Sequence, residues 1–259
     1  MNPAITDISQ AIQRWQLVIF IGLSNVKARY RRSVLGPLWL TLGTVVGAAG
    51  LGFLWSELLK VPRHEFVPSL TAGLIIWQFV SGVIMEGVYG FSRQAATIKN
   101  TSQPYFIHPM QVVLQQFVNF LHNIPVFFLV AWILDVSFNL NMLWVLPCLI
   151  LLILNLLWLA LLLGILGARF RDIEFIINMV MPLLLFTSPV FYRPNYLPFS
   201  EDIMWFNPFS HLIELIRHPL LGSPPPDFVV LTNLAFLVVG WTLAVWLFNR
   251  KYNSLAFWL

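Results

Sequence analysis

The side chains that could carry chemistry are widely spaced in this chain, and their order matches none of the common catalytic or cofactor motifs. None of the four lysines follows a glycine, so the sequence lacks the loop that cradles phosphates in many nucleotide hydrolases. The nearest approach to a serine-nucleophile motif, residues 22–25 (GLSN), lacks the second glycine. No His-Glu-x-x-His pair occurs among the five histidines, which are His64, His108, His122, His211 and His218. The sequence therefore predicts no catalytic residue, no metal site and no cofactor in this chain.

Glu86 is an acidic residue that falls within a long apolar stretch, residues 69–89. A carboxylate in such a place is a functional candidate by default. Arg93 follows two helical turns later, however, and an acid near the end of a helix is more often solvated or paired. We therefore predict that Glu86 has a structural role.

Composition indicates the kind of element that must position these side chains. Of the 259 residues, 58% are hydrophobic and only 10% are charged, against about 25% charged in a soluble domain. So few charges cannot cover the surface of a soluble fold of this length, which indicates a membrane protein. The net charge of +4 does not indicate nucleic-acid binding, because the basic residues are spread along the chain. The single cysteine, Cys148, excludes a disulfide framework.

Six apolar segments are long enough to cross a bilayer core, which takes about 20 helical residues. They are residues 38–58, 69–89, 112–134, 142–166, 176–191 and 228–248. We interpret the chain as an all-α integral membrane protein. Residues 1–259 form a single transmembrane domain, with an interface helix and elbow at 1–34 and a six-span bundle at 35–259.

The distribution of charge predicts the orientation of the bundle. An even number of spans puts both termini on one side, and with that side cytoplasmic 11 of the 15 basic residues lie inside. Seven of the 11 acidic residues then lie outside. An excess of Lys and Arg in cytoplasmic loops is the usual bias, so both termini are predicted to be cytoplasmic.

Two segments do not fit simple spanning. Residues 2–19 predict an amphipathic helix in the cytoplasmic interface, because apolar residues recur there at steps of three and four. These residues are Ile5, Ile8, Ile12, Trp15 and Ile19. The Pro-rich residues 189–226 hold two apolar runs, 203–206 and 212–221, that are too short to span. They predict two short re-entrant or interfacial helices on the outer side, with an ordered extracellular loop as the alternative.

Residues 27–39 (KARYRRSVLGPLW) resemble the N-terminal signature of the permease subunits of bacterial ATP-binding-cassette (ABC) polysaccharide exporters. That family moves lipid-linked O-antigen, capsule and teichoic-acid chains. Asn207-Pro208 followed by His211, Glu214 and Arg217 is similar to its segment between the fifth and sixth spans, and residues 169–172 (RFRD) to its second cytoplasmic loop. The resemblance covers the whole chain in span count and loop lengths. It implies a transport subunit in the bacterial inner membrane that forms a homodimer and works with a cytoplasmic ATPase, which binds ATP and Mg²⁺.

The resemblance also implies roles for two groups of residues at the cytoplasmic side. The elbow residues expected to rest on the ATPase are Lys27, Arg29, Tyr30, Arg31, Arg32, Gly36 and Pro37. Loops 91–110, with a short helix at 93–100, and 168–175 are expected to be coupling helices that dock on the ATPase. Their candidate residues are Arg93, Lys99, Arg169, Arg171, Asp172 and Glu174. The bases alone would also fit the positive-inside bias, whereas the two acids favour docking.

In the family, the first, second and fifth spans form the substrate channel. Aromatic faces pack well against sugar rings, which makes Trp55, Trp77, Phe186, Phe191 and Tyr192 candidate channel residues. The outer Pro-rich segment is a candidate external gate, with Trp205, Phe206, Phe209, His211, Glu214 and Arg217 as its residues.

Two alternatives remain open at the sequence level. An exporter of drugs or small lipids would share the superfamily. A membrane enzyme acting on lipid-linked sugars would need a cluster of acids and histidines at one membrane face. The residues nearest to such a cluster are Glu201, Asp202, His211, Glu214 and Arg217.

Overall fold

The computed structural model describes residues 3–31, 33–36, 38–193 and 204–259, and the regular secondary structure of these residues is entirely helical, with no strand among them. Arg32, Pro37, Glu201 and Asp202 lie outside the described residues. The helices are α1 (Pro3–Gln13), α2 (Trp15–Tyr30), α3 (Leu38–Leu59), α4 (Arg63–Val88), α5 (Ala95–Asn100), α6 (Ile107–Ile133), α7 (Val145–Arg169), α8 (Asp172–Thr187), α10 (Pro208–Leu220), α11 (Asp227–Lys251) and α12 (Leu255–Trp258). Short 3₁₀ turns, η1 (Ser92–Gln94), η2 (Leu140–Trp144) and η4 (Tyr252–Ser254), precede α5, α7 and α12.

Five helical stretches in the described residues are long and apolar enough to cross a membrane: α3, α4, α6, η2 with α7, and α11 with the helical turns that follow it. The chain is therefore a multi-pass membrane protein. The remaining predicted span, 176–191, coincides with α8, which has only 16 residues. At 1.5 Å per residue α8 is roughly 24 Å long, less than the roughly 30 Å of a bilayer core. The six-span topology thus stays a prediction.

Helix α4 is the centre of the bundle. In its most apolar stretch 72% of the residues are buried, against 17% in α3 and 22% in α11. It packs on α3, α6, α7, α8 and α10, and its core side chains include Ile76, Phe79, Val80 and Val83. A helix that is apolar all round is covered by protein or lipid, so α4 is the scaffold and α3 and α11 present apolar faces outward.

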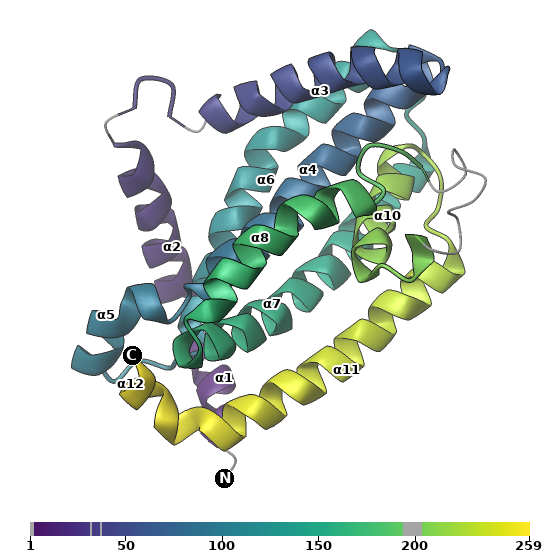
Figure 1. The fold of residues 1–259 in the computed structure, drawn as a ribbon. Coiled ribbons are helices and arrows are strands. Elements are labelled where there is room, and N and C mark those ends of the chain that lie inside the picture. The colour runs from purple at the N-terminus through teal and green to yellow at the C-terminus, as the bar shows by residue number, and fades with distance from the viewer. Residues whose placement is uncertain (1–2, 32, 37, 194–203) are drawn as a thin grey trace.

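The two ends of the bundle differ. Helices α1, α5 and α12 gather at one end, and α10 lies at the other (Figure 1). The first of these ends also holds Arg93, Lys99, Arg169 and Arg250, and we call it the basic end; the other is the α10 end. Helix α8 packs on α4 and α7 and runs from the basic end to the α10 end.

The predicted interface helix at residues 2–19 is two helices in the structure. A turn at Arg14 separates α1 from α2, and α2 continues to Tyr30. Lys27, Arg29 and Tyr30 therefore belong to the last turns of a helix instead of a connecting segment. The predicted apolar face is exposed at Ile5, Ile12, Trp15 and Ile19, as a helix lying in a lipid interface requires.

Candidate functional site

Glu86 forms an ion pair with Arg93 at the basic end, and its other carboxylate oxygen lies 3.8 Å from Nη2 of Arg29. The Arg93 guanidinium also lies over the Tyr89 ring, 4.3 Å from its centroid. Glu86 belongs to α4, Arg29 to α2 and Arg93 to η1, so one carboxylate connects the elbow with the first predicted coupling loop. The structural role predicted for Glu86 agrees with this pairing.

The two predicted coupling loops lie close together at this end. The first contains η1 and α5, which agrees with the helix expected at 93–100, and Lys99 is in the last turn of α5. The second is the corner between α7 and α8: Arg169 ends α7, whereas Asp172 and Glu174 lie in the first turn of α8. Negative charge is favourable there because the helix N-terminus carries partial positive charge.

Helix α12 bridges the two loops. It packs on α5 and on α7, and the Arg169 guanidinium lies 5.3 Å from the centroid of the Trp258 ring. Sequence reasoning ended the last span at residue 248 and assigned nothing to these residues. A short apolar run, Leu255-Ala-Phe-Trp258, follows Arg250-Lys251 and could have indicated a further helical turn there.

The sequence did not indicate a role for Asp7, although its carboxylate joins three segments at the basic end by hydrogen bonds. Its carboxylate accepts hydrogen bonds from the backbone N–H groups of Tyr105 (2.8 Å) and Phe106 (2.9 Å), before α6, and from the Tyr252 hydroxyl (3.1 Å). Burial raises the pKa of Asp7 above its usual range, although these hydrogen bonds favour the charged form. Ala4, Asp7 and Ala11 form the buried stripe of α1, which adjoins the apolar face that the sequence highlighted; Ile8 of that face is partly buried against the same cluster.

At the α10 end, Glu214 and Arg217 form an ion pair with almost no exposure to solvent. Arg217 Nη1 also donates to the Pro189 carbonyl oxygen at 2.6 Å, and its guanidinium reaches the Tyr192 carbonyl at 3.4 Å. Helix α10 is thereby tied to the turn that follows α8. A Cβ on Gly73 would lie 2.8 Å from the Val190 carbonyl oxygen, so a glycine is needed for α4 to approach the same turn.

The other predicted gate residues have different surroundings. His211 Nε2 donates to the Trp205 carbonyl at 2.9 Å, and the Trp205 ring packs on Phe228 with 4.7 Å between centroids. Phe206 is 88% exposed. The charged groups of Glu214 and Arg217 are thus occupied by contacts within the protein, which does not favour the enzyme alternative, whereas His211 Nδ1 is buried without a hydrogen-bond partner among the described residues.

Four of the five candidate channel aromatics come together at the α10 end. Trp55 stacks on Phe191 with 6.0 Å between ring centroids, Phe186 lies 5.5 Å from Phe191, and the Tyr192 hydroxyl donates to the Phe186 carbonyl. Trp77 is buried elsewhere, against Phe209. The structure therefore groups aromatics of α3 and the α8 turn and leaves Trp77 apart from them.

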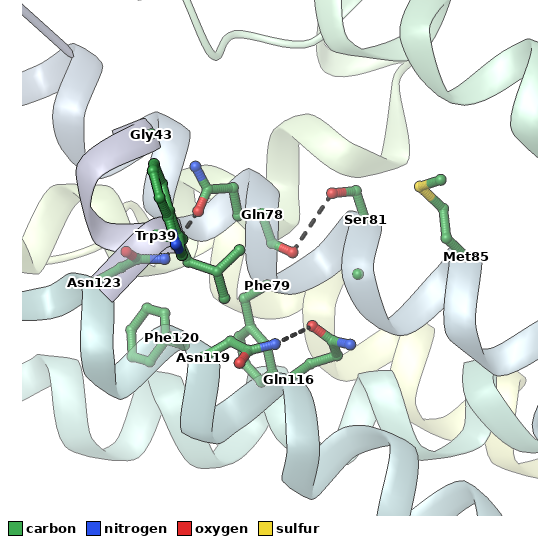
Figure 2. A pocket seen from close by; sticks show the side chains of 12 residues that line it. Trp39, Gly43, Gln78, Phe79, Ser81, Met85, Gln116, Asn119, Phe120 and Asn123 are labelled. Carbon is green, nitrogen blue, oxygen red and sulfur yellow. Dashed lines mark hydrogen bonds between the residues drawn. The ribbon is translucent and has the colours of Figure 1, made fainter. Parts of the chain in front are cut away.

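A cavity of about 340 Å³, lined by both polar and apolar side chains, lies between α3, α4 and α6 (Figure 2). Thr44 hydrogen-bonds with Gln78 and Asn123, and Asn123 donates to Gln78 at 2.9 Å. On the α6 side, Asn119 donates to Gln116 at 3.0 Å. Sequence reasoning missed this group, although amides at 116, 119 and 123 share one face of a helix that is otherwise largely apolar.

No cluster of three or more metal-ligating side chains occurs within the part of the chain that the structure describes.

Comparison with known proteins identifies the relatives of this architecture. The ABC-2 type transporter family model matches residues 16–221, which is most of the chain. Two O-antigen export system permease proteins RfbA of Klebsiella pneumoniae are 25% and 23% identical over 248 residues, covering 92% of this chain and 93% of each relative. The Myxococcus xanthus protein of the same name is 25% identical over 180 residues, 68% of both chains.

Proposed function

This chain belongs to the ABC-2 type transporter family, and we propose that it is the membrane-spanning subunit of an exporter that moves a lipid-linked polysaccharide of the O-antigen or capsule type. The observation that carries the proposal is the end-to-end similarity to two O-antigen export permeases, which extends over 92% of the chain. An ABC-2 permease works with an ATPase, so ATP and Mg²⁺ belong to that partner. The location is the bacterial inner membrane.

The basic end is the surface for the ATPase under this proposal, which makes it cytoplasmic together with both termini. Lys99 on α5 and Arg171, Asp172 and Glu174 at the α7–α8 corner are the docking groups. Two features support this: α12 holds both loops side by side, and Glu86 connects the first loop with the elbow residue Arg29. A force applied at either loop would reach α4, α7 and α8 through packed helices.

The same arrangement supports the proposed six-span topology. Helix α7 ends and α8 begins at the basic end, whereas α11 begins at the α10 end (Figure 1). In the proposed topology α8, with the turn after it, is the span that carries the chain from one end to the other. A polysaccharide needs a wider path than one chain of this size encloses, so two copies form the transporter. Trp55, Phe186, Phe191 and Tyr192 then line its path, and the segment around α10 is the outer gate.

Accumulation of substrate inside the cell tests the function. In cells from which the gene is deleted, a lipid-linked glycan should accumulate on the cytoplasmic side and disappear from the surface, and the gene on a plasmid should reverse both changes. Extraction of lipid-linked sugars measures the glycan that accumulates inside the cell, and surface labelling measures the glycan that reaches the outside. Unchanged surface glycan with a changed efflux of drugs or small lipids would favour that other class of exporter.

A further inference from the structure

The cavity between α3, α4 and α6 is lined by uncharged residues: five carry hydrogen-bonding side chains, one is the exposed Trp39, and the other six are apolar residues or glycines. We propose that it binds a neutral sugar ring of a lipid-linked glycan, an inference that rests on the proposed function. Its polar residues come from three helices: Trp39 from α3, Gln78 and Ser81 from α4, and Gln116, Asn119 and Asn123 from α6. Figure 2 shows the Gln78 amide and the Trp39 ring on one side of the cavity and Asn119 with Gln116 on the other.

Several polar atoms around the cavity are left free by the protein's own contacts. Trp39 Nε1, Gln116 Nε2 and Asn119 Oδ1 have no hydrogen-bond partner among the residues that the structure describes. The Gln116 side chain is nevertheless buried, at 7% exposure. In an apolar medium an unmade hydrogen bond is costly, so these groups favour a polar occupant. They supply both donors and acceptors, which is what a ring of hydroxyl groups requires.

The chemistry of the lining selects a neutral ligand. No Lys, Arg, Asp or Glu is among the 12 lining residues, so the cavity offers no counter-charge for a phosphate or a carboxylate. The Trp39 ring is 61% exposed, and an aromatic face packs against the C–H side of a sugar ring while its hydroxyls bond elsewhere. Amides facing an aromatic ring therefore favour a sugar over a lipid phosphate.

Two glycines leave the space that a ring needs. A Cβ on Gly82 would lie 2.6 Å from Gln116 Oε1, so the glycine is what allows α4 to approach this amide. A Cβ on Gly43 would meet no atom within 4 Å, so the α3 wall of the cavity is open at this position. A larger side chain at residue 43 would occupy the cavity without a clash in the backbone.

The cavity is reached from the bilayer. Leu40 and Met85, which line it, are 37% and 39% exposed on helices that belong to candidate spans, and Trp39 is next to Leu40. Its lining residues lie in the first turns of α3, in the second half of α4 and near the middle of α6, a position within candidate spans that suits a sugar still attached to a membrane-embedded lipid. The proposed ligand is therefore the sugar of a glycolipid and not a soluble sugar.

Ligand-dependent thermal stability tests the site without a transport assay. The chain is placed in nanodiscs that contain monoglucosyl diacylglycerol, diacylglycerol alone, or diacylglycerol with free glucose in the buffer. A ligand that binds only the folded state raises the unfolding temperature in proportion to its occupancy. We expect the increase with the glucosyl lipid alone.

Two α3 variants form a matched pair for this measurement. Gly43→Leu fills the cavity, whereas Gly50→Leu adds the same side chain to the same helix at a position that does not line the cavity and is equally open. The glucosyl-lipid concentration for half-maximal stabilisation should rise at least about tenfold in Gly43→Leu and stay unchanged in Gly50→Leu. Asn119→Leu, which removes an amide but little volume, should behave like Gly43→Leu, and it replaces that variant if Gly43→Leu does not fold.

Three results would overturn the inference. If diacylglycerol alone stabilises the chain as much as the glucosyl lipid does, no sugar is recognised. If free glucose stabilises it as much as the glucosyl lipid does, the ligand does not need to reach the cavity from the bilayer. Unaltered binding in Gly43→Leu and Asn119→Leu places the ligand elsewhere. None of these results bears on glycan accumulation in the deletion strain, so the proposed function can stand when this inference fails, and the reverse also holds.

Discussion

Glu214 and Arg217 form a charged pair that is almost fully removed from solvent, and each depends on the other. A buried ion pair adds little over an apolar pair of similar size, because taking both charges out of water costs about as much as their attraction returns. Removal of one partner leaves an uncompensated buried charge. This pair therefore fixes how α10 sits on the turn after α8 and adds little to net stability.

We expect Arg217→Leu to lower the free energy of unfolding by about 3–5 kcal/mol, and Glu214→Leu with Arg217→Leu to recover a large part of that loss. Denaturant unfolding of the purified chain measures both. Arg63→Leu is the control, since it breaks an exposed pair with Glu57 and should cost at most about 1 kcal/mol. If Arg217→Leu costs no more than Arg63→Leu, the pair does not secure α10.

His218 gives the α10 end a dependence on pH. Burial, followed by the nearby Arg217 and Arg193 guanidiniums, lowers the pKa of His218 to about 4. The Glu214 carboxylate, 3.4 Å away, acts in the opposite direction but is already paired with Arg217. Between pH 6.5 and 4 the unfolded chain binds a proton at this residue and the folded chain does not, so stability falls as pH falls through that range.

The matching experiment compares the unfolding temperature of the parent chain and of His218→Gln from pH 7 to pH 4. The unfolding temperature of the parent minus that of His218→Gln should be largest at pH 7. It should decrease, or become negative, towards pH 4, because only the parent has an imidazole whose protonation in the unfolded chain lowers stability. Parallel curves for the two proteins would show that His218 is not responsible.

At the scale of elements, the α7–α8 corner combines bases with acids where the membrane surface attracts bases alone. Within the described residues no ion pair joins Arg171, Asp172 or Glu174 to another side chain, so these charges remain open to a partner protein.

Reversal of these charges should reduce transport without affecting assembly. We expect Arg171→Glu or Asp172→Arg to reduce both glycan export and the transport-linked stimulation of the ATPase, with membrane insertion and dimerisation unchanged. Arg250→Glu, a reversal at the same end but outside both loops, is the control. If both test variants export glycan at the rate of the parent chain, the α7–α8 corner only connects two helices and does not transmit force from the ATPase.

Helix α10 and the residues before it make a second prediction at this scale. Single cysteines from 203 to 215 in a Cys148→Ser background can be probed from outside with a membrane-impermeant thiol reagent. Phe206→Cys should react fast, because that side chain is 88% exposed, and Ile213→Cys and Leu215→Cys should react slowly, because both are fully buried. A gate also requires that the pattern changes when the ATPase is active. Residue 203 lies outside the described part of the chain.

Uniform labelling that does not respond to ATP would mean that this segment is a solvated loop, the alternative that the sequence left open. A helical pattern that does not respond to ATP would support the fold of α10 and contradict its role as a gate.

At the scale of the whole molecule, the division of labour between permease and ATPase makes a simple prediction. The purified chain should not hydrolyse ATP above background and should do so only in complex with its ATPase, because no lysine follows a glycine in a phosphate-binding loop. Phosphate release by the chain alone and by the complex measures this. A Walker-lysine variant of the ATPase controls for contamination, and robust turnover by the chain alone would contradict the assignment.

The sequence alone was sufficient for the class of protein and for the positions of most helices. Long apolar runs and charged connections are local properties, and a bilayer admits only helices or closed barrels, so α3, α7 and α11 could be located to within three residues, whereas the predicted spans at 69 and 112 begin six and five residues after α4 and α6 begin. The short helix of the first loop was also predicted, and α10 at 208–220 overlaps the short helix predicted at 212–221, whose re-entrant position stays a prediction. The resemblance at residues 27–39 identified the family that the comparison then showed.

Only the tertiary structure decided which side chains meet. Asp7 and Tyr252 form a hydrogen bond across 245 residues, and Thr44 meets Asn123 across 79, separations for which periodicity gives no information. Trp77 and Trp55 look alike in the sequence, yet one is buried against Phe209 and the other stacks on Phe191. The physical reason is that apolar patterning defines which residues avoid water but not whether lipid or protein covers them, and in a membrane that choice depends on how the helices pack against one another.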